Sequence, residues 1–405
     1  MKIAAVIAEY NPLHKGHLWQ LQKLRERGAS HIVVVMSPNF TQRGTPAIFP
    51  KRVRAAAALD AGADLVVELP TAYACAGAQG FAFGAVYLVQ AMGCVDWLGF
   101  GAEDADVALL RQAAGALQEY AVRGQLQLEL AKGITFAAAR EEAVRQVCGD
   151  AVASVLQSPN NILAVEYLTQ LEQLAATVEP VALERVGNAH DGAPVEGYAS
   201  ASFLRELLYQ GRWEQAEPYL PQKAAVRFQQ AAQMGKLAKM KNGERAVLSA
   251  LRQMRREELA LLPDLSEGIE NRLYAASQRA CSLDELYSLI KTKRYPLSRV
   301  RRLVLAAFLQ IPGQAHKLPP PYLRVLAMNG RGKEILSTMK RTASLPVSVS
   351  LKTLSKTSAN AHDCAELEAA CTDRYYSTFT QQIFPGGLDY TEPVVRIEDD
   401  FTKNA

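Results

Sequence analysis

The chain has 405 residues, of which 49% are hydrophobic and 21% charged, and its formal net charge is +4. This length and composition are typical of a soluble globular protein of roughly two domains. No apolar run approaches the ~20 residues of a membrane span, and Glu9 interrupts the first apolar run, so neither membrane association nor a signal peptide is expected. The six cysteines form no C-x-x-C pair, which favours buried thiols in a cytoplasmic protein over zinc sites or disulfides.

The first ~105 residues alternate between short apolar runs and longer segments with helical periodicity. Strands are predicted at 3–8, 31–36, 64–68 and 96–100, and helices at 17–28, 51–61 and 77–92. Alternation of this kind is typical of a doubly wound parallel sheet with right-handed crossovers. The sequence therefore predicts an α/β, Rossmann-like fold for this part.

The remaining residues are mostly helical by the same criterion. Helices are expected over most of 107–157 and from 158 to 171, followed by a last strand at 181–186 and a helix from Ser200. Beyond Trp213 strand signals are few, and helices are predicted at about 222–235, 242–261, 266–278, 282–291, 297–309 and 331–342. We therefore expect an α/β domain at 1–210 and an all-helical domain at 211–405.

His14 and His17 flank Gly16 where the first helix should begin. Free backbone N–H groups and the helix dipole attract phosphate there, and glycine lets a nucleotide come close. Two solvent-exposed histidines are the alternative; a zinc pair is not expected, because the spacing is not i, i+4. The pattern favours a nucleotide site in which both imidazoles stabilise charge on an α-phosphate as pyrophosphate leaves.

Two further segments are expected to line the same crevice, because the carboxyl ends of parallel strands share one edge of the sheet. One is the polar loop at 37–44, which follows the second strand. The other is the helix start at Ser200 to Arg205. Ser200 or Ser202 is the expected N-cap, and a hydroxyl at a helix start also suits phosphate.

The stretch from Lys291 to Arg341 holds twelve Lys or Arg against one acid, Glu334, an excess of +11. A solvated charged face is the alternative explanation. A nucleic-acid surface is preferred, because a phosphate footprint needs many cations in one region. Tyr295 and Tyr322 lie in this stretch and are candidates to stack on unpaired bases. The predicted RNA-binding residues are Lys291, Lys293, Arg294, Arg299, Arg301 and Arg302.

Two of these motifs resemble those of the HIGH nucleotidyltransferase superfamily. The segment His14-Lys15-Gly16-His17 is similar to its H-x-G-H motif. Residues 200–205 are similar to its second motif, usually written I-S-S-T-x-I-R, from which Ala199, Ala201 and Ser202 depart. The hydroxyls of Ser200 and Ser202 both stay candidates for the phosphate contact.

The chain resembles one branch of that superfamily more closely, the bacterial tRNA(Met) cytidine acetate ligase family. The resemblance covers the whole chain and is carried by four motifs in order, at 9–17, 39–44, 158–163 and 185–187. It implies that ATP activates acetate to acetyl-adenylate with loss of pyrophosphate. The acetyl group then passes to the exocyclic amine of the wobble cytidine in elongator tRNA(Met). Magnesium is expected with ATP, although no carboxylate cluster is assigned to it.

The resemblance also implies which residues form the site. The catalytic residues would be His14, His17, Ser202 and Arg205. Arg43 is a further candidate donor to acetate or phosphate. The alternatives are a turn at Gly101, a helix N-cap at Asn160 or Asn161, an acid partner or solvent for Arg185, and a solvated helix position for Arg205. The implied ATP contacts are Ile7, Ala8, Glu9, Tyr10, Asn11, Pro12, Leu13, His14, Lys15, Gly16, His17, Leu18, Gly101, Asn161 and Arg185.

Two other functions stay open from the sequence. An H-x-G-H site also serves small-molecule nucleotidyltransferases, which join AMP or CMP to a phosphorylated substrate. A non-catalytic RNA-binding protein with a degenerate nucleotide pocket is the third hypothesis. The ~200 helical and basic residues after the first domain argue against the former, and the intact His14, Gly16, His17 and Arg205 argue against the latter.

Overall fold

The computed structural model describes residues 1–186, 194–265, 268–293, 295–380 and 384–398. Its centre is a mostly parallel sheet in which β5, β2, β1, β6 and β7 lie side by side in that order. This strand order is that of a doubly wound sheet, so the α/β prediction is confirmed. The bounds of these strands are Ile3–Ala8 (β1), His31–Met36 (β2), Leu65–Glu68 (β5), Trp97–Ala102 (β6) and Glu179–Glu184 (β7).

Helices cover both faces of the sheet, because successive strand residues point to opposite sides. In β2, Val33 and Val35 belong to one apolar core, while Ile32 and Val34 belong to the other. The first face is covered by α4 (Ala78–Ala91), α9 (Pro159–Gln173) and α18 (Gly330–Thr342). The second is covered by α1 (Lys15–Glu26), α2 (Lys51–Asp60), α10 (Ala201–Tyr209) and α12 (Gln222–Gln233).

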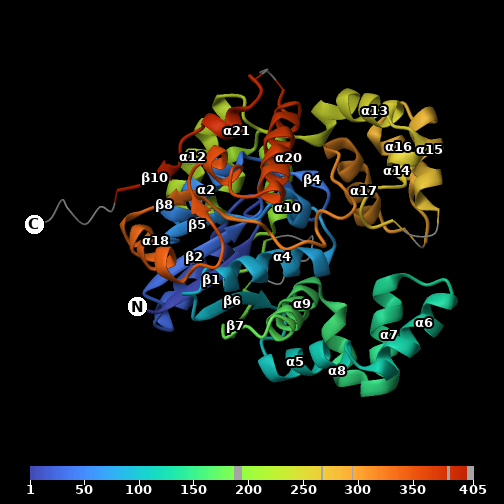
Figure 1. Cartoon of the computed structure of the whole chain (residues 1–405), viewed down its shortest axis with the longest axis horizontal. Helices are drawn as coiled ribbons and strands as arrows, with labels where there is room; N and C mark the ends of the chain where they lie inside the picture. The colour runs from blue at the N-terminus through green and yellow to red at the C-terminus, as the bar shows by residue number, and fades with distance from the viewer. Residues whose placement is uncertain (187–193, 266–267, 294, 381–383, 399–405) are drawn as a thin grey trace, which may run out of the picture.

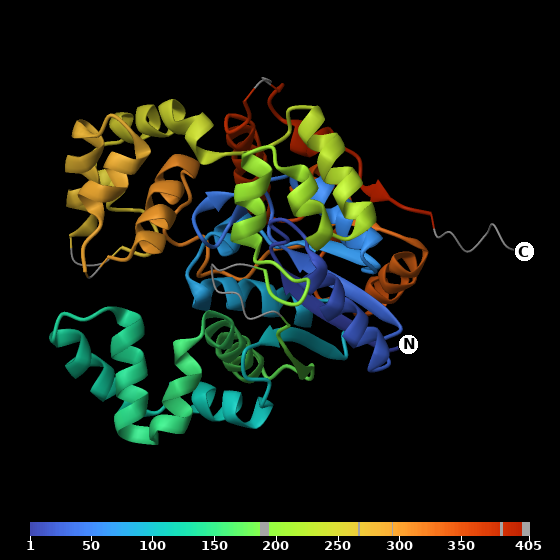
Figure 2. The same cartoon turned by 180° about the vertical axis from the view of Figure 1, so that it is seen from behind.

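Two helical lobes project from the same side of the sheet layers, one teal and one yellow to orange (Figures 1 and 2). The teal lobe contains α5 (Val107–Ala116), α6 (Tyr120–Ala131), α7 (Phe136–Cys148) and α8 (Asp150–Ser154). The other lobe contains α13 (Glu244–Gln253), α14 (Arg256–Leu259), α15 (Ile269–Arg279), α16 (Leu283–Ile290) and α17 (Leu297–Leu309). The single helix predicted at 242–261 is thus divided, because Met254 is extended, with ψ of 134°.

The 18-residue helix α20 (Ala359–Tyr376) and several short elements connect these parts. The short elements are β3 (Phe40–Thr41), β4 (Thr45–Pro46), α3 (Thr71–Ala74), η1 (Val155–Gln157), α11 (Trp213–Ala216), η2 (Glu217–Tyr219), η3 (Met240–Gly243), α19 (Leu351–Leu354) and α21 (Leu388–Thr391). Among the helices of the described ranges, none has the length and apolar character needed to cross a membrane.

The expectation of an all-helical C-terminal half needs a correction. β8 (Leu323–Met328) pairs antiparallel with β5, and β10 (Val395–Arg396) and β9 (Val347–Ser348) pair with β8. The sequence carried a signal for β8, an apolar run between prolines and Asn329-Gly330. The strand was not predicted because Arg324 lies within this run, and a cation is rarely buried within a strand.

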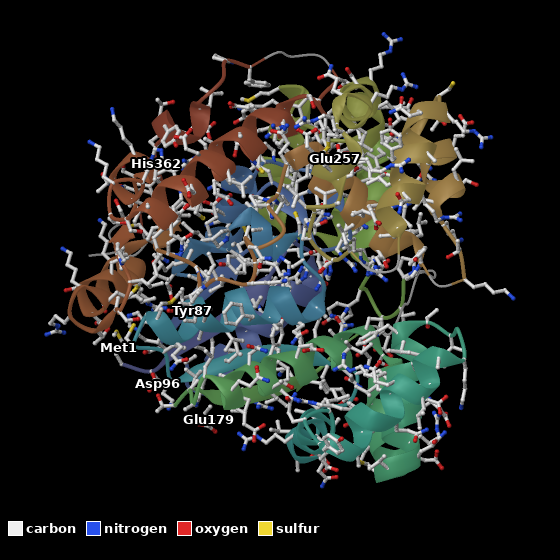
Figure 3. The ribbon with its side chains drawn as sticks, turned by 45° about the vertical axis from the view of Figure 1, so that its right-hand side comes forward. Met1, Tyr87, Asp96, Glu179, Glu257 and His362 are labelled. Atoms are coloured by element: carbon white, nitrogen blue, oxygen red, sulfur yellow. The ribbon has the colours of Figure 1, made fainter. Side chains whose placement is uncertain are left out.

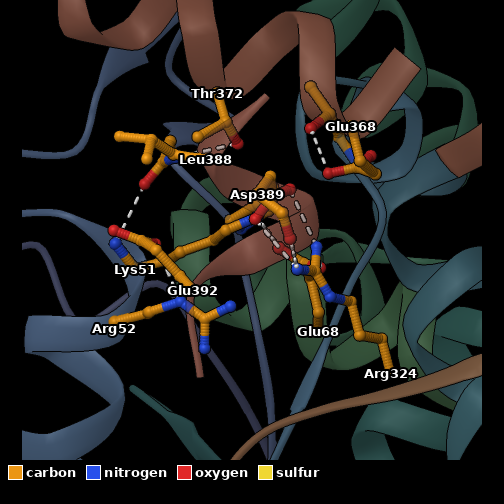
Figure 4. A network of polar contacts seen from close by, with 12 residues as sticks. Lys51, Arg52, Glu68, Arg324, Glu368, Thr372, Leu388, Asp389 and Glu392 are labelled. Carbon is orange, nitrogen blue, oxygen red and sulfur yellow. Dashed lines mark hydrogen bonds and ion pairs between the residues drawn. The ribbon is translucent and has the colours of Figure 1, made fainter. Parts of the chain in front are cut away.

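A buried charge network holds this returning segment on the first half of the chain (Figure 4). The guanidinium of Arg324 donates to Glu68 at 2.8 Å and to both carboxylate oxygens of Asp389 at 2.8 and 2.9 Å. Lys51 donates to the same two acids, at 2.5 and 2.8 Å. Each buried charge therefore has opposite partners, which offset the cost of removing it from water.

Candidate active site

The predicted nucleotide residues gather at the carboxyl edge of the sheet. Met1, Asp96 and Glu179 lie close together in Figure 3 and mark the opposite edge, where β1, β6 and β7 begin. At the carboxyl edge, Ile7 and Ala8 end β1, and the turn from Tyr10 to Leu13 is buried. Lys15 is exposed on the first turn of α1, and Leu18 packs against the core.

His14 and His17 form a reciprocal cap at the start of α1. Nδ1 of His14 accepts the backbone N–H of Gly16 at 3.1 Å, and Nδ1 of His17 accepts that of His14 at 3.2 Å. The two ring centroids are 3.9 Å apart, and Tyr10 packs edge-on against His17 at 4.9 Å. The backbone of the turn therefore fixes the orientation of both rings.

The surroundings also fix the charge of these rings. Burial, together with the cations of Arg185 and Arg205, lowers the pKa of His14 to about 3. Burial, His14 and Arg185 lower the pKa of His17 as well. In a neutral imidazole one nitrogen accepts and the other carries the proton, so both rings present an Nε2–H donor.

Gly16 has a more specific role than close approach of a nucleotide. A Cβ at this position would lie 3.0 Å from Cε1 and 3.1 Å from Nδ1 of His14. Such contacts are tighter than ordinary van der Waals contact, so a side chain at position 16 would shift the ring of His14 by a few tenths of an ångström and disturb its hydrogen bond. Glycine is needed here to seat the histidine.

The start of α10 meets the histidine turn from the other side. Ser200 is the N-cap and accepts the backbone N–H of Phe203 at 3.2 Å. Capping uses this oxygen as an acceptor, whereas a phosphate contact needs the O–H as a donor, so Ser200 and Ser202, in the first helical turn, both stay candidates for that contact. Arg205 donates to the backbone carbonyl of Asn11 at 2.7 Å. The second superfamily motif thus contacts the turn that leads into the H-x-G-H motif.

Gly101, Asn161 and Arg185 meet at the ends of β6 and β7. A Cβ on Gly101 would lie 3.2 Å from Cγ of Arg185, so glycine lets this arginine lie across β6. Gly101 sits within β6 and is not the turn of the alternative hypothesis. Arg185 donates to Oδ1 of Asn160 at 3.4 Å.

Asn161 supports the loop that follows β6. Its Oδ1 accepts the backbone N–H groups of Glu103 at 2.9 Å and Asp104 at 3.1 Å. The helix N-cap alternative is wrong for both Asn160 and Asn161, because Ser158 occupies the N-cap position of α9 and the helix begins at Pro159. Asn161 is buried and thereby shapes the rim of the crevice next to Arg185.

Arg54 is a residue that the sequence did not single out. It is fully buried in α2 and donates to the backbone carbonyls of Glu9 at 2.6 Å, Ser37 at 3.1 Å and Phe49 at 2.9 Å. Arg54 therefore ties the loops after β1 and β2 together. The sequence could have indicated Arg54, because it is a cation in an alanine-rich helix that packs on a sheet.

The basic segment at 291–341 does not form one surface. Arg324 is buried in the charge network, and α17 and α18 lie on opposite sides of the molecule (Figure 1). Tyr295 and Tyr322 are buried, with 6% and 1% exposure, so the proposed stacking on bases is wrong for both. The prediction of one basic surface rested on closeness in the sequence alone, and the packing of the chain separates these residues.

The predicted RNA-binding residues nevertheless cluster around α17. Lys291 and Lys293 are exposed just before it, while Arg299, Arg301 and Arg302 are half-buried on its first turns. Arg299 lies 5.5 Å from the ring of Tyr295, and Arg301 lies 5.7 Å from that of Tyr287. Arg294 lies outside the described residues.

These features define a class of protein. The family model of the HIGH Nucleotidyl Transferase matches residues 1–385. The parallel sheet and the paired histidines at the start of α1 agree with that match, so the chain is a HIGH nucleotidyltransferase.

The relatives define the particular family. A tRNA(Met) cytidine acetate ligase from Thermoanaerobacter sp. (strain X514) is 35% identical over 406 residues, which cover 98% of this chain and 100% of that protein. The protein of the same name from Acetivibrio thermocellus is 33% identical over 414 residues, with the same coverage. The chain therefore belongs to the tRNA(Met) cytidine acetate ligase family. A small-molecule nucleotidyltransferase is not favoured by these relatives.

Solved structures agree with this assignment. The crystal structure of Thermotoga maritima TmcAL bound with alpha-thio ATP superposes with a TM-score of 0.92 at 30% identity, covering 98% of this chain and 100% of that one. Its apo form gives a TM-score of 0.93 with the same identity and coverage. The relationship therefore extends over the whole described fold.

Proposed function

We propose that this chain activates acetate with ATP and transfers the acetyl group to the wobble cytidine of elongator tRNA(Met). The observation that carries the proposal is the pair of neutral histidines, His14 and His17, held at the start of α1 beside Arg205. Their Nε2–H groups suit an α-phosphate that gains charge. The names of the relatives indicate acetate as the source of the acyl group and the cytidine of tRNA(Met) as its acceptor.

The first step forms acetyl-adenylate. One carboxylate oxygen of acetate attacks the α-phosphorus of ATP, the bond to the bridging oxygen of the β-phosphate breaks, and pyrophosphate leaves. His14, His17 and Arg205 would donate to the phosphate oxygens, and Ser202 would contribute its hydroxyl. Neutral imidazoles act here as positioned hydrogen-bond donors, so catalysis rests on orientation and electrostatics.

The second step transfers the acetyl group. The exocyclic amine of cytidine attacks the acetyl carbonyl carbon, the bond to the AMP oxygen breaks and the amine loses one proton. The products are acetylcytidine in tRNA and AMP. A tRNA substrate also supports the predicted cytoplasmic location.

Magnesium would enter with ATP. Across the described ranges there is no group of three or more His, Cys, Asp or Glu that could hold a metal ion. Mg²⁺ commonly keeps several waters and binds through substrate phosphates with few protein ligands. The residues present therefore fit a metal carried by the triphosphate, whose charge it would neutralise.

Mass spectrometry of elongator tRNA(Met) tests the proposed function. After incubation of the protein with ATP and isotopically labelled acetate, we expect one labelled acetyl group on the wobble cytidine. Reactions without ATP, or with a His14→Asn variant, should leave the tRNA unmodified. Absence of labelled acetylcytidine with the native protein would contradict the proposal.

A further inference from the structure

The β3–β4 hairpin, residues 40–46, connects the nucleotide site with the basic helix α17. On its inner side, the backbone N–H of Gln42 donates to Oε1 of Glu9 at 2.8 Å, next to the histidine turn. The hairpin closes through Gly44, whose φ is +73° and whose N–H donates to the carbonyl of Thr41 at 2.9 Å. The loop after β2 is thus anchored to the residue that follows β1.

The other side of the hairpin rests on α17. A Cβ on Gly44 would lie 2.6 Å from the carbonyl carbon of Arg301 and 2.6 Å from the nitrogen of Arg302. These are backbone atoms that cannot move aside, so the hairpin tip touches the helix backbone directly. Figure 1 shows β4 beside α17, in agreement with the packing of the two elements.

Arg43 occupies the tip between these two attachments. It is exposed, whereas the neighbouring hairpin residues Phe40, Thr41 and Gly44 are buried. Its cation acts on the carboxylate of Glu9 at the nucleotide site, and the next residue in the chain packs on α17. Arg43 therefore lies between Glu9 of the nucleotide site and the basic helix α17.

We propose that Arg43 binds a backbone phosphate of tRNA next to the cytidine that accepts the acetyl group. This inference rests on the proposed function. The acceptor base must reach the adenylate at the strand ends while its backbone stays outside, and the cations around α17 provide the continuing path. A guanidinium suits this role, because it binds phosphate through two parallel hydrogen bonds.

The geometry favours tRNA over acetate as the ligand of Arg43. Acetate must react at the α-phosphate, among His14, His17 and Arg205, whereas Arg43 is solvent-exposed at the hairpin tip.

The experiment separates the two half-reactions in an Arg43→Gln variant. Acetate-dependent exchange of pyrophosphate into ATP, measured without tRNA, reports adenylate formation. Acetylation of tRNA(Met) reports transfer. We expect exchange within about twofold of the native rate and a kcat/KM for tRNA about tenfold lower, the order expected for one lost charge-assisted hydrogen bond. The dependence of tRNA affinity on salt should weaken by about one phosphate contact.

Two matched variants sharpen the result. Arg111→Gln removes an exposed arginine from α5 and should leave both half-reactions unchanged. Arg43→Lys keeps the charge but loses the planar fork, so it should restore most of the salt dependence and only part of the kcat/KM.

Other outcomes would overturn the assignment. Equal loss of exchange and transfer in Arg43→Gln would place Arg43 in adenylate formation. No loss of either activity would show that Arg43 takes part neither in adenylate formation nor in tRNA binding. Failure of the proposed function itself is distinguishable, because the native protein would then show neither acetate-dependent exchange nor acetylcytidine.

Discussion

Nδ1 of His17 accepts the backbone N–H of His14 at 3.2 Å, so the second histidine of the pair orients the first through the main chain. Nδ1 of His14 in turn accepts the N–H of Gly16. With both Nδ1 atoms accepting, the proton of each neutral ring lies on Nε2. The turn thus holds two neutral imidazole donors in place before any nucleotide arrives.

Nitrogen NMR of the labelled protein checks this protonation state. Burial lowers the pKa of His14 to about 3, so we expect its ring to stay neutral, with the proton on Nε2, between about pH 5 and 8. Because the folded-state pKa is below the unfolded value, the associated stability is present above about pH 6.5 and is lost as the pH falls. A titration of His14 near its ordinary pKa would contradict the expected burial.

A Gly16→Ala variant should separate activity from stability. Alanine favours a helix by up to about 1 kcal/mol, and disturbing the His14 cap costs a similar amount, so the melting temperature should change little. The new methyl group would meet the ring of His14 at 3.0 Å, and acetate-dependent exchange should fall by about 10²-fold as the ring is displaced. Gly115→Ala, in α5 with open space around the position, is the control, and its exchange rate should not change.

The buried network predicts a large stability loss for Arg324→Met. This change leaves Glu68 and Asp389 without one of their two cations. Removal of one partner from a buried ion pair costs about 3–5 kcal/mol, which urea unfolding would measure. Lys333→Met, at an exposed position of α18, should cost no more than about 0.5 kcal/mol. Equal small effects in both variants would argue against a tightly paired network.

Glu368 makes stability depend on pH. Burial, with the nearby charge of Glu68, raises the pKa of Glu368 to about 8. The folded state therefore holds a proton that the unfolded chain releases near its ordinary pKa of about 4.3, so this contribution is full below that pH and is lost as the pH rises through 8. We expect the melting temperature of Glu368→Gln to vary less between about pH 6 and 9 than that of the native protein. Identical pH profiles would refute this.

The two parts of the basic segment should differ in tRNA binding. A Lys291→Gln, Lys293→Gln double variant, next to α17, should bind tRNA more weakly, with a salt slope reduced by about 1.5 to 2. The matched double variant Lys340→Gln, Arg341→Gln changes exposed cations at the end of α18. It should leave affinity and slope unchanged. Filter binding over a range of salt concentrations distinguishes the two, and a reversed order would place tRNA on the α18 side.

The sequence by itself determined the parallel strands and the histidine turn. A strand that is buried on both faces needs a continuous apolar run, such as Ile3 to Ala8. This run is local, so six residues are enough to recognise the strand. The H-x-G-H spacing likewise depends on one turn of backbone. These features were predicted because their physical causes lie within a short stretch of chain.

Only the tertiary structure decided the rest. β8 pairs with a strand more than 250 residues earlier in the chain, and Arg324 became part of the core because Glu68 and Asp389 reach it from distant segments. The same holds for Gly44 on α17 and for the neutrality of His14. Burial and charge pairing depend on what the whole chain brings together, and no local pattern records them.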